Sequence, residues 1–239
     1  MNFFASIREL PPPWRVEVRW SVCLGAVVTG LLAGALVSAA CRLVFRFSAL
    51  ALGASFHIAS SAAALLVLFL AKPRLNLAAK LGIGKVRFPE VKLALGGLGA
   101  VYLFELATLP LWGFILRRMG VDYSEKQSLL ELCAGADWRL FVWLLLLVGL
   151  VIPAAEELFF RRLLFGALRP LGVFSALFLA AVIFGVLHWF IYGMWVLMFF
   201  GIVLQWLYLR SGNLATNILA HSVFNLVSLC AAFIMGGPR

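Results

Sequence analysis

Three short stretches of the sequence place acid, base and amide side chains inside otherwise apolar segments. In "PAAEELFFRR" Glu156 and Glu157 stand side by side, "FGVLH" ends at His188, and "HSVFN" runs from His221 to Asn225. A carboxylate beside a neutral imidazole can take a proton from water, and a second imidazole with an amide can stabilise an oxyanion. Together these residue types suit hydrolysis of an amide bond by activated water.

The two adjacent carboxylates differ in the partners that a helix would give them. Glu157 and Arg161 are four residues apart, on one helix face and in the order that favours an ion pair. Glu156 is rotated by about 100° from its neighbour and lacks that partner. Because an ionised carboxylate in hydrocarbon costs ~2.5–3.5 kcal/mol or more, we expect Glu157 to be structural and Glu156 to be available for chemistry. The spacing alone is equally consistent with a helix end at the membrane surface.

The histidines also have simpler interpretations. A single histidine near the end of an apolar helix, as His188 is, often lies at the membrane interface. His221 and Asn225 share a helix face, where they could serve only as an interhelical hydrogen bond. The third histidine, His57, lies alone in an apolar segment, and no role is assigned to it.

The composition identifies the surroundings of these side chains as lipid. Of 239 residues, 64% are hydrophobic and 13% charged, and the mean hydropathy is +1.05. Soluble proteins are nearer half apolar and a quarter charged, so we predict an all-α polytopic membrane protein. The net charge of +10 then reflects cytoplasmic loops beside anionic lipid headgroups, and no nucleic-acid partner is expected. The four cysteines form no CxxC pair, which argues against a disulfide framework or a zinc cluster.

About seven apolar segments are long enough to cross a membrane, which takes about 20 residues. They cover 20–41, 48–71, 93–116, 140–168, 171–190, 191–209 and 214–235. The predicted parts are a lead (1–19), three N-terminal membrane helices (20–116), a loop with a short interfacial helix (117–139) and a catalytic core of four helices (140–239). In the loop 117–139, Ser124 and Gln127 have the spacing of a capping box. The loop 72–92 has six Lys or Arg and one Glu, so we expect it and the N-terminus on the cytoplasmic side.

The depth of the polar residues decides whether they can meet. If the helix that starts at 140 continues through Arg161 to the turn "RPLG", Glu156 lies about 18 Å above that turn. His221 lies about 15 Å above the next turn on the same side, "RSGN". The carboxylate, both imidazoles and the Asn225 amide then fall within about two helical turns of depth. This agreement favours one shared site within the membrane.

A metal site is the competing interpretation of the same residues. Two histidines and a glutamate form a common catalytic zinc set, although the sequence has no HExxH motif and the ligands would come from three helices. We expect no metal and no other cofactor, and keep a zinc-dependent hydrolase as the alternative.

Glu156-Glu157-x-x-x-Arg161, Phe184-x-x-x-His188 and His221-x-x-x-Asn225, in this order, resemble the three motifs of the CPBP family. This family includes the type II CAAX prenyl endopeptidases and the bacterial Abi membrane proteins. The resemblance covers about 140–235. Bacterial relatives often read "FRG" where this chain has Phe160-Arg161-Arg162, which is the one departure in the motifs.

The resemblance implies a glutamate-type intramembrane endopeptidase. Glu156 would activate water as the general base with help from His188, while His221 and Asn225 would stabilise the oxyanion. The supporting residues would be Glu157, Arg161 and Phe184. The expected substrate is a membrane-tethered peptide or protein, and the expected location is the bacterial inner membrane.

Two other classes of protein remain as alternatives. A non-catalytic immunity or assembly factor would use the polar residues only to hold helices together. A transporter or proton relay also uses intramembrane Glu and His. Against it, the charged residues gather at one site and no inverted repeat is evident.

Overall fold

The computed structural model describes residues 19–45, 49–71, 82–121, 128–188 and 190–236, which are mostly helical and contain no strand. Five helical stretches are long and apolar enough to cross a membrane: Trp20–Val44, Phe88–Arg118, Trp138–Leu171, Met194–Ser211 and Leu214–Met235. Two shorter apolar stretches are Ile58–Val67 and Val173–Val186. The seven stretches lie where the seven apolar segments were predicted, although two are shorter than expected, and they confirm an all-α polytopic membrane protein.

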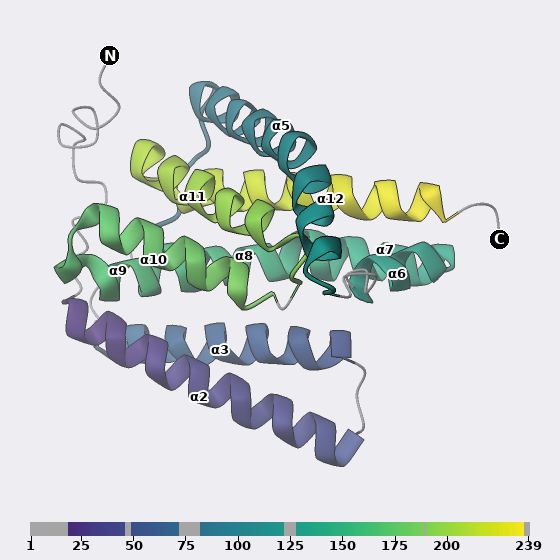
Figure 1. The fold of residues 1–239 in the computed structure, drawn as a ribbon. Coiled ribbons are helices and arrows are strands. Elements are labelled where there is room, and N and C mark those ends of the chain that lie inside the picture. Colours follow the sequence, from purple (N-terminus) through teal and green to yellow (C-terminus); the bar gives the residue numbers. More distant parts are fainter. Residues whose placement is uncertain (1–18, 46–48, 72–81, 122–127, 189, 237–239) are drawn as a thin grey trace.

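The helices pack in a simple order around one central element. Helices α2 (Trp20–Phe45) and α3 (Ala49–Ala71) form a hairpin along one side, and the long helix that contains α8 (Ile152–Glu157) runs beside it (Figure 1). On the other side of that helix lies α12 (Leu214–Met235), and α11 (Met194–Ser211) packs against α12 (Figure 1). The hydroxyl of Ser61 on α3 donates to the carbonyl of Ala155 at 3.0 Å, so the hairpin holds α8 directly.

The central helix runs without a break from Trp138 to Leu168, as the depth argument required. Its parts are α7 (Trp138–Leu146), a π-helical turn η1 (Leu147–Val151), α8, a second π-helical turn η2 (Leu158–Leu164) and α9 (Phe165–Leu168). Asp137 caps its start by accepting the N–H of Leu140 at 2.8 Å. Pro153 lacks an N–H and cannot bond to the carbonyl four residues earlier, which accounts for the π distortion at η1.

One turn beside α10 (Val173–Val186) lies where it was predicted, whereas the end of this helix does not. The turn at 169–172 is present: a 3₁₀ turn, η3 (Arg169–Leu171), is followed by Gly172 at φ 94°, a left-handed backbone that favours glycine. The predicted helix 171–190 is too long, because α10 ends at Val186 and α11 begins only at Met194, after Gly193 at its N-cap. His188 therefore lies in the connecting turn, beyond the end of the helix.

The predicted interfacial helix corresponds to α6 (Ser128–Gly135), which packs against α12. The Cys133 thiol donates to the Leu229 carbonyl of α12 at 3.2 Å. The proposed capping residues Ser124 and Gln127, most of the lead 1–19 and the side chain of His57 lie outside the described residues.

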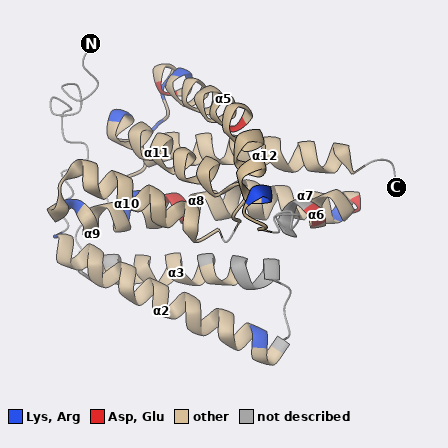
Figure 2. Ribbon diagram, viewed as in Figure 1, with Lys and Arg blue, Asp and Glu red and all other residues tan. Residues whose placement is uncertain are grey.

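A cluster of hydrogen bonds among Glu90, Asn213 and Thr216, here called the Glu90 cluster, joins the start of α5 (Phe88–Arg118) to the start of α12. Buried Glu90 accepts hydrogen bonds from Thr216 at 2.9 Å and from the Asn213 amide at 3.2 Å. The side-chain oxygen of Asn213 accepts the N–H of Gly84 at 2.8 Å and that of Ala215 at 3.1 Å. These bonds bring the first turns of α5 and α12 to the same level. Apart from the Glu90 cluster and the carboxylates of α8, Figure 2 shows few charges within the helix bundle.

Candidate active site

Glu156 and Glu157 end α8 between the two π-helical turns and face His221 of α12. The Nδ1 atom of His221 lies 2.7 Å from Oε1 of Glu157, and its Nε2 atom lies 3.6 Å from Oε2 of Glu156. Exposed fractions are 3% for Glu156, 0% for Glu157 and 2% for His221. One imidazole thus stands between two carboxylates in a buried setting. The contact with Glu157 is a direct hydrogen bond, whereas 3.6 Å is too long for one.

Glu157 is held by side chains of its own helix and of α12. Arg161, one turn later, places Nε 3.0 Å from Oε2 of Glu157, which is the ion pair expected from the spacing. The Nε–H is not aimed at that oxygen, since Arg161 makes no hydrogen bond through any of its three nitrogens, so the contact is one of charge. Asn217 of α12 donates to the same oxygen at 3.2 Å.

The ring of Phe184 on α10 lies among the charged side chains. The Arg161 guanidinium carbon is 4.8 Å from the ring centroid, within the range of a cation–π contact. The rings of His188 and His221 are 4.7 Å and 5.8 Å from the same centroid. Phe184 therefore connects Arg161 with both imidazoles, and its position fits the supporting role given to it.

His188 and Asn225 lie at the edge of this group. The half-buried His188 has Nδ1 2.7 Å from the Phe184 carbonyl, a contact that fixes one nitrogen of its ring. The Asn225 amide donates to the Val148 carbonyl in η1 at 2.9 Å. The amide that was expected beside His221 as an oxyanion donor thus uses one N–H to satisfy the backbone of a π-helical turn.

Comparison with protein families gives one match, over the part of the chain that carries these residues. Residues 138–227 match the family model described as Type II CAAX prenyl endopeptidase Rce1-like. This part of the chain is similar to the Rce1-like family. The comparisons with curated proteins and with solved structures gave no match. The match confirms the resemblance on the motifs and begins one residue after the Asp137 cap.

Within the Rce1-like segment, the sequence reasoning missed Asn217. Its amide is fully buried and donates both to Glu157 and, at 2.6 Å, to the Leu204 carbonyl of α11. Asn217 precedes His221 by four residues, so it lies on the same helix face as His221 and Asn225. The pattern Asn-x-x-x-His-x-x-x-Asn could have revealed it. Glu90 itself lies outside the segment, and no motif revealed its contacts with Asn213 and Thr216.

The donor set of the Rce1-like segment bears on the zinc alternative. Among the residues whose placement is described, no group of three or more His, Cys, Asp and Glu side chains is arranged to hold a metal ion. Glu156 and His221 could supply two ligands, while the Nδ1 atom of His188 is held by the Phe184 carbonyl. A catalytic zinc ion takes three protein ligands, one more than Glu156 and His221 provide.

Proposed function

We propose that this protein is an intramembrane endopeptidase that hydrolyses a peptide bond in a membrane-associated peptide or protein. The observation that carries the proposal is the His221 ring, bonded to Glu157 on one side and 3.6 Å from Glu156 on the other. The protease family of residues 138–227 supports the class of reaction. A substrate tethered to the membrane and a site in the bacterial inner membrane, with the N-terminus cytoplasmic, belong to the same proposal.

The His221 ring is placed between the two carboxylates in the proposed mechanism. Its Nδ1 atom is bonded to Glu157, and its Nε2 atom is directed toward Glu156. An N–H at Nε2 is the donor that we propose for a developing oxyanion.

The proposed reaction has two steps, addition of water to the carbonyl and cleavage of the C–N bond. Glu156 takes a proton from water while the water oxygen bonds to the carbonyl carbon, and the carbonyl oxygen becomes an oxyanion. The Nε2–H of His221 and the second N–H of Asn225 stabilise that charge, and low polarity strengthens both interactions. The C–N bond breaks as Glu156 returns its proton to the leaving amine. His188 assists at the edge of the site, and Glu157 and Arg161 hold His221 in place.

The deciding experiment compares the termini of membrane peptides in cells that carry the wild type or Glu156→Gln at equal protein level. Termini present with the wild type and absent with the nearly isosteric variant establish proteolysis and identify the substrate and the bond. Glu131→Gln, at an exposed glutamate of α6, is the matched control and retains every terminus. If all termini persist in Glu156→Gln, Glu156 is not the base, and the non-catalytic factor takes the place of the protease.

A further inference from the structure

A second carboxylate lies within a membrane helix, away from the site described above. Glu105 is on α5, 17 positions after Phe88 and 13 before Arg118. By helical rise it is about 25 Å from one end of α5 and about 20 Å from the other. Ionisable residues at such depth are rare and are mostly functional. In the described part of the chain, Glu105 makes no ion pair and no hydrogen bond.

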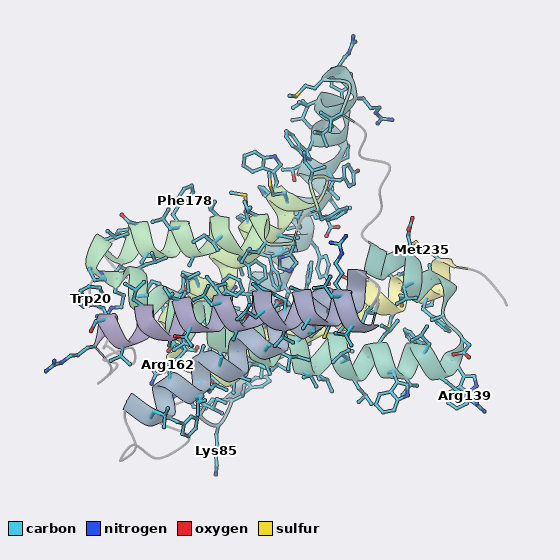
Figure 3. The ribbon with its side chains drawn as sticks, turned by 90° about the horizontal axis from the view of Figure 1, so that it is seen from below. Trp20, Lys85, Arg139, Arg162, Phe178 and Met235 are labelled. Atoms are coloured by element: carbon cyan, nitrogen blue, oxygen red, sulfur yellow. The ribbon has the colours of Figure 1, made fainter. Side chains whose placement is uncertain are left out.

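Glu105 continues the inward face of α5. Ala94, Leu98 and Val101 are buried at 3%, 4% and 0% exposure, and positions 94, 98, 101 and 105 follow the spacing of one helix face. Glu105 is only half-buried, between Val101 and the buried Leu116 near the end of the helix. On the same helix Leu103 and Leu106 are 70% and 74% exposed, and the C-terminal part of α5 stands away from the other helices (Figure 3).

Contacts on either side of Glu105 connect it to the proposed catalytic residues. One turn earlier, the Tyr102 ring stacks on Phe224 of α12, with centroids 5.6 Å apart, and Phe224 directly precedes Asn225. Two turns later, Trp112 donates to the Ile191 carbonyl at 3.0 Å, in the turn that carries His188. Glu105 is thus placed between the two elements that bear His188 and Asn225.

The Tyr102 hydroxyl adds a second unsatisfied polar group. It is buried and has no hydrogen-bond partner among the described residues. A buried polar group without a partner costs about 1–3 kcal/mol, and a carboxylate in hydrocarbon costs more. A bound cation would satisfy both groups, and the faces of Tyr102 and Phe224 would add a cation–π contribution.

We propose that Glu105 and Tyr102 bind a positively charged side chain, Lys or Arg, in the peptide that the protein cleaves. The proposal rests on the proposed function, because the occupant is the substrate segment next to the scissile bond. A lipid amine has the same chemistry but is held at headgroup level, about 20 Å along α5 from Glu105. A basic side chain within an apolar peptide needs such a partner, since burying it alone is costly.

The test measures binding without cleavage. The full chain carrying Glu156→Gln is placed in nanodiscs of phosphatidylcholine and phosphatidylglycerol, which contain no primary amine. The probes are fluorescent apolar peptides of about 20 residues with a single Lys or Gln moved along the sequence, and binding to empty nanodiscs is subtracted. We expect the Lys peptide to bind about tenfold more tightly than the Gln peptide at one position, the size of one charged hydrogen bond.

Two further variants separate binding from loss of structure. Glu105→Gln removes the advantage of Lys, whereas Glu131→Gln, a change of the same kind at an exposed position, retains it. Glu105→Lys gives the preference to peptides with Glu at the same position, a gain that a misfolded protein cannot produce. The proposal is overturned if Lys gives no advantage at any position, or if the advantage persists in Glu105→Gln. Neither result affects the assignment of Glu156, which the comparison of termini decides separately.

Discussion

Glu157 and His221 meet at 2.7 Å although 64 residues separate them, and this contact fixes α12 to α8 at the level of the proposed chemistry. The carboxylate accepts from Nδ1 and thereby turns Nε2 toward Glu156. Glu157 also neutralises Arg161, so it has both a structural role and a role in orienting the imidazole.

Replacement of Glu157 by Gln therefore lowers both stability and activity. The change leaves the buried Arg161 guanidinium without its counter-charge, which costs about 3–5 kcal/mol. Thermal unfolding in detergent and cleavage of the identified substrate measure the two effects. Glu156→Gln, by contrast, abolishes cleavage and changes stability by about 1 kcal/mol or less. Equal unfolding temperatures for Glu157→Gln and the wild type would contradict the structural role.

Asn217 is expected to act through Glu157 and His221. Asn217→Ala removes two buried hydrogen bonds, to Glu157 and to the Leu204 carbonyl, which costs about 1–3 kcal/mol of stability. Because Asn217 orients Glu157 and His221 and does not touch substrate, kcat falls while KM stays within about twofold. Steady-state kinetics on the purified protein give both values. A rise in KM at constant kcat would instead place Asn217 in substrate binding.

Close packing of the α2–α3 hairpin depends on Gly30. A Cβ at this position would lie 2.6 Å from the Ser60 carbonyl oxygen, whereas a Cβ at Gly25 meets nothing within 4 Å. Gly30→Val should therefore lower stability by about 1–3 kcal/mol through overpacking. Gly25→Val, on the same helix, carries the same cost in helix propensity and serves as the control. Similar unfolding temperatures for the two variants would show that the hairpin can separate without loss of stability.

Removal of metal should leave the proposed activity intact. Glu156 and His221 form a pair and not a ligand set of three, and proton transfer by Glu156 needs no metal ion. Cleavage by the purified protein is measured after dialysis against a chelator. A loss of activity that Zn²⁺ restores would favour the zinc-dependent alternative over the glutamate mechanism.

The sequence predicted the fold well because apolar length and turn residues determine it. The runs before "RPLG" and "RSGN" gave two turns where Gly172 and Gly212 take left-handed backbone angles. The end of α10 was missed because residues 187–193 are nearly as apolar as the helices beside them, so hydrophobicity carries no boundary there. The π-helical turns were also missed, since hydrophobic spacing does not reveal one extra residue in a helical turn.

The site was predicted less completely, for a reason of geometry. Spacing along one helix gave the Glu157–Arg161 contact, and depth brought His221 to the level of Glu156. Depth does not fix how a helix is rotated about its axis. The sequence therefore left undetermined that His221 bonds to Glu157 and that Asn225 turns toward Val148.

The Glu90 cluster joins α5 and α12 at one end only. Hydrogen bonds from Asn213 and Thr216 tie the two helices there, whereas farther along the Tyr102 ring rests on Phe224 by stacking. Two helices that are held by hydrogen bonds at one end separate most easily at the other end. Separation there breaks the dispersion contacts of the Tyr102 and Phe224 rings and no buried hydrogen bond between α5 and α12. A substrate could thus enter from the lipid by a change of angle about a fixed pivot, with the carboxylates of α8 left undisturbed.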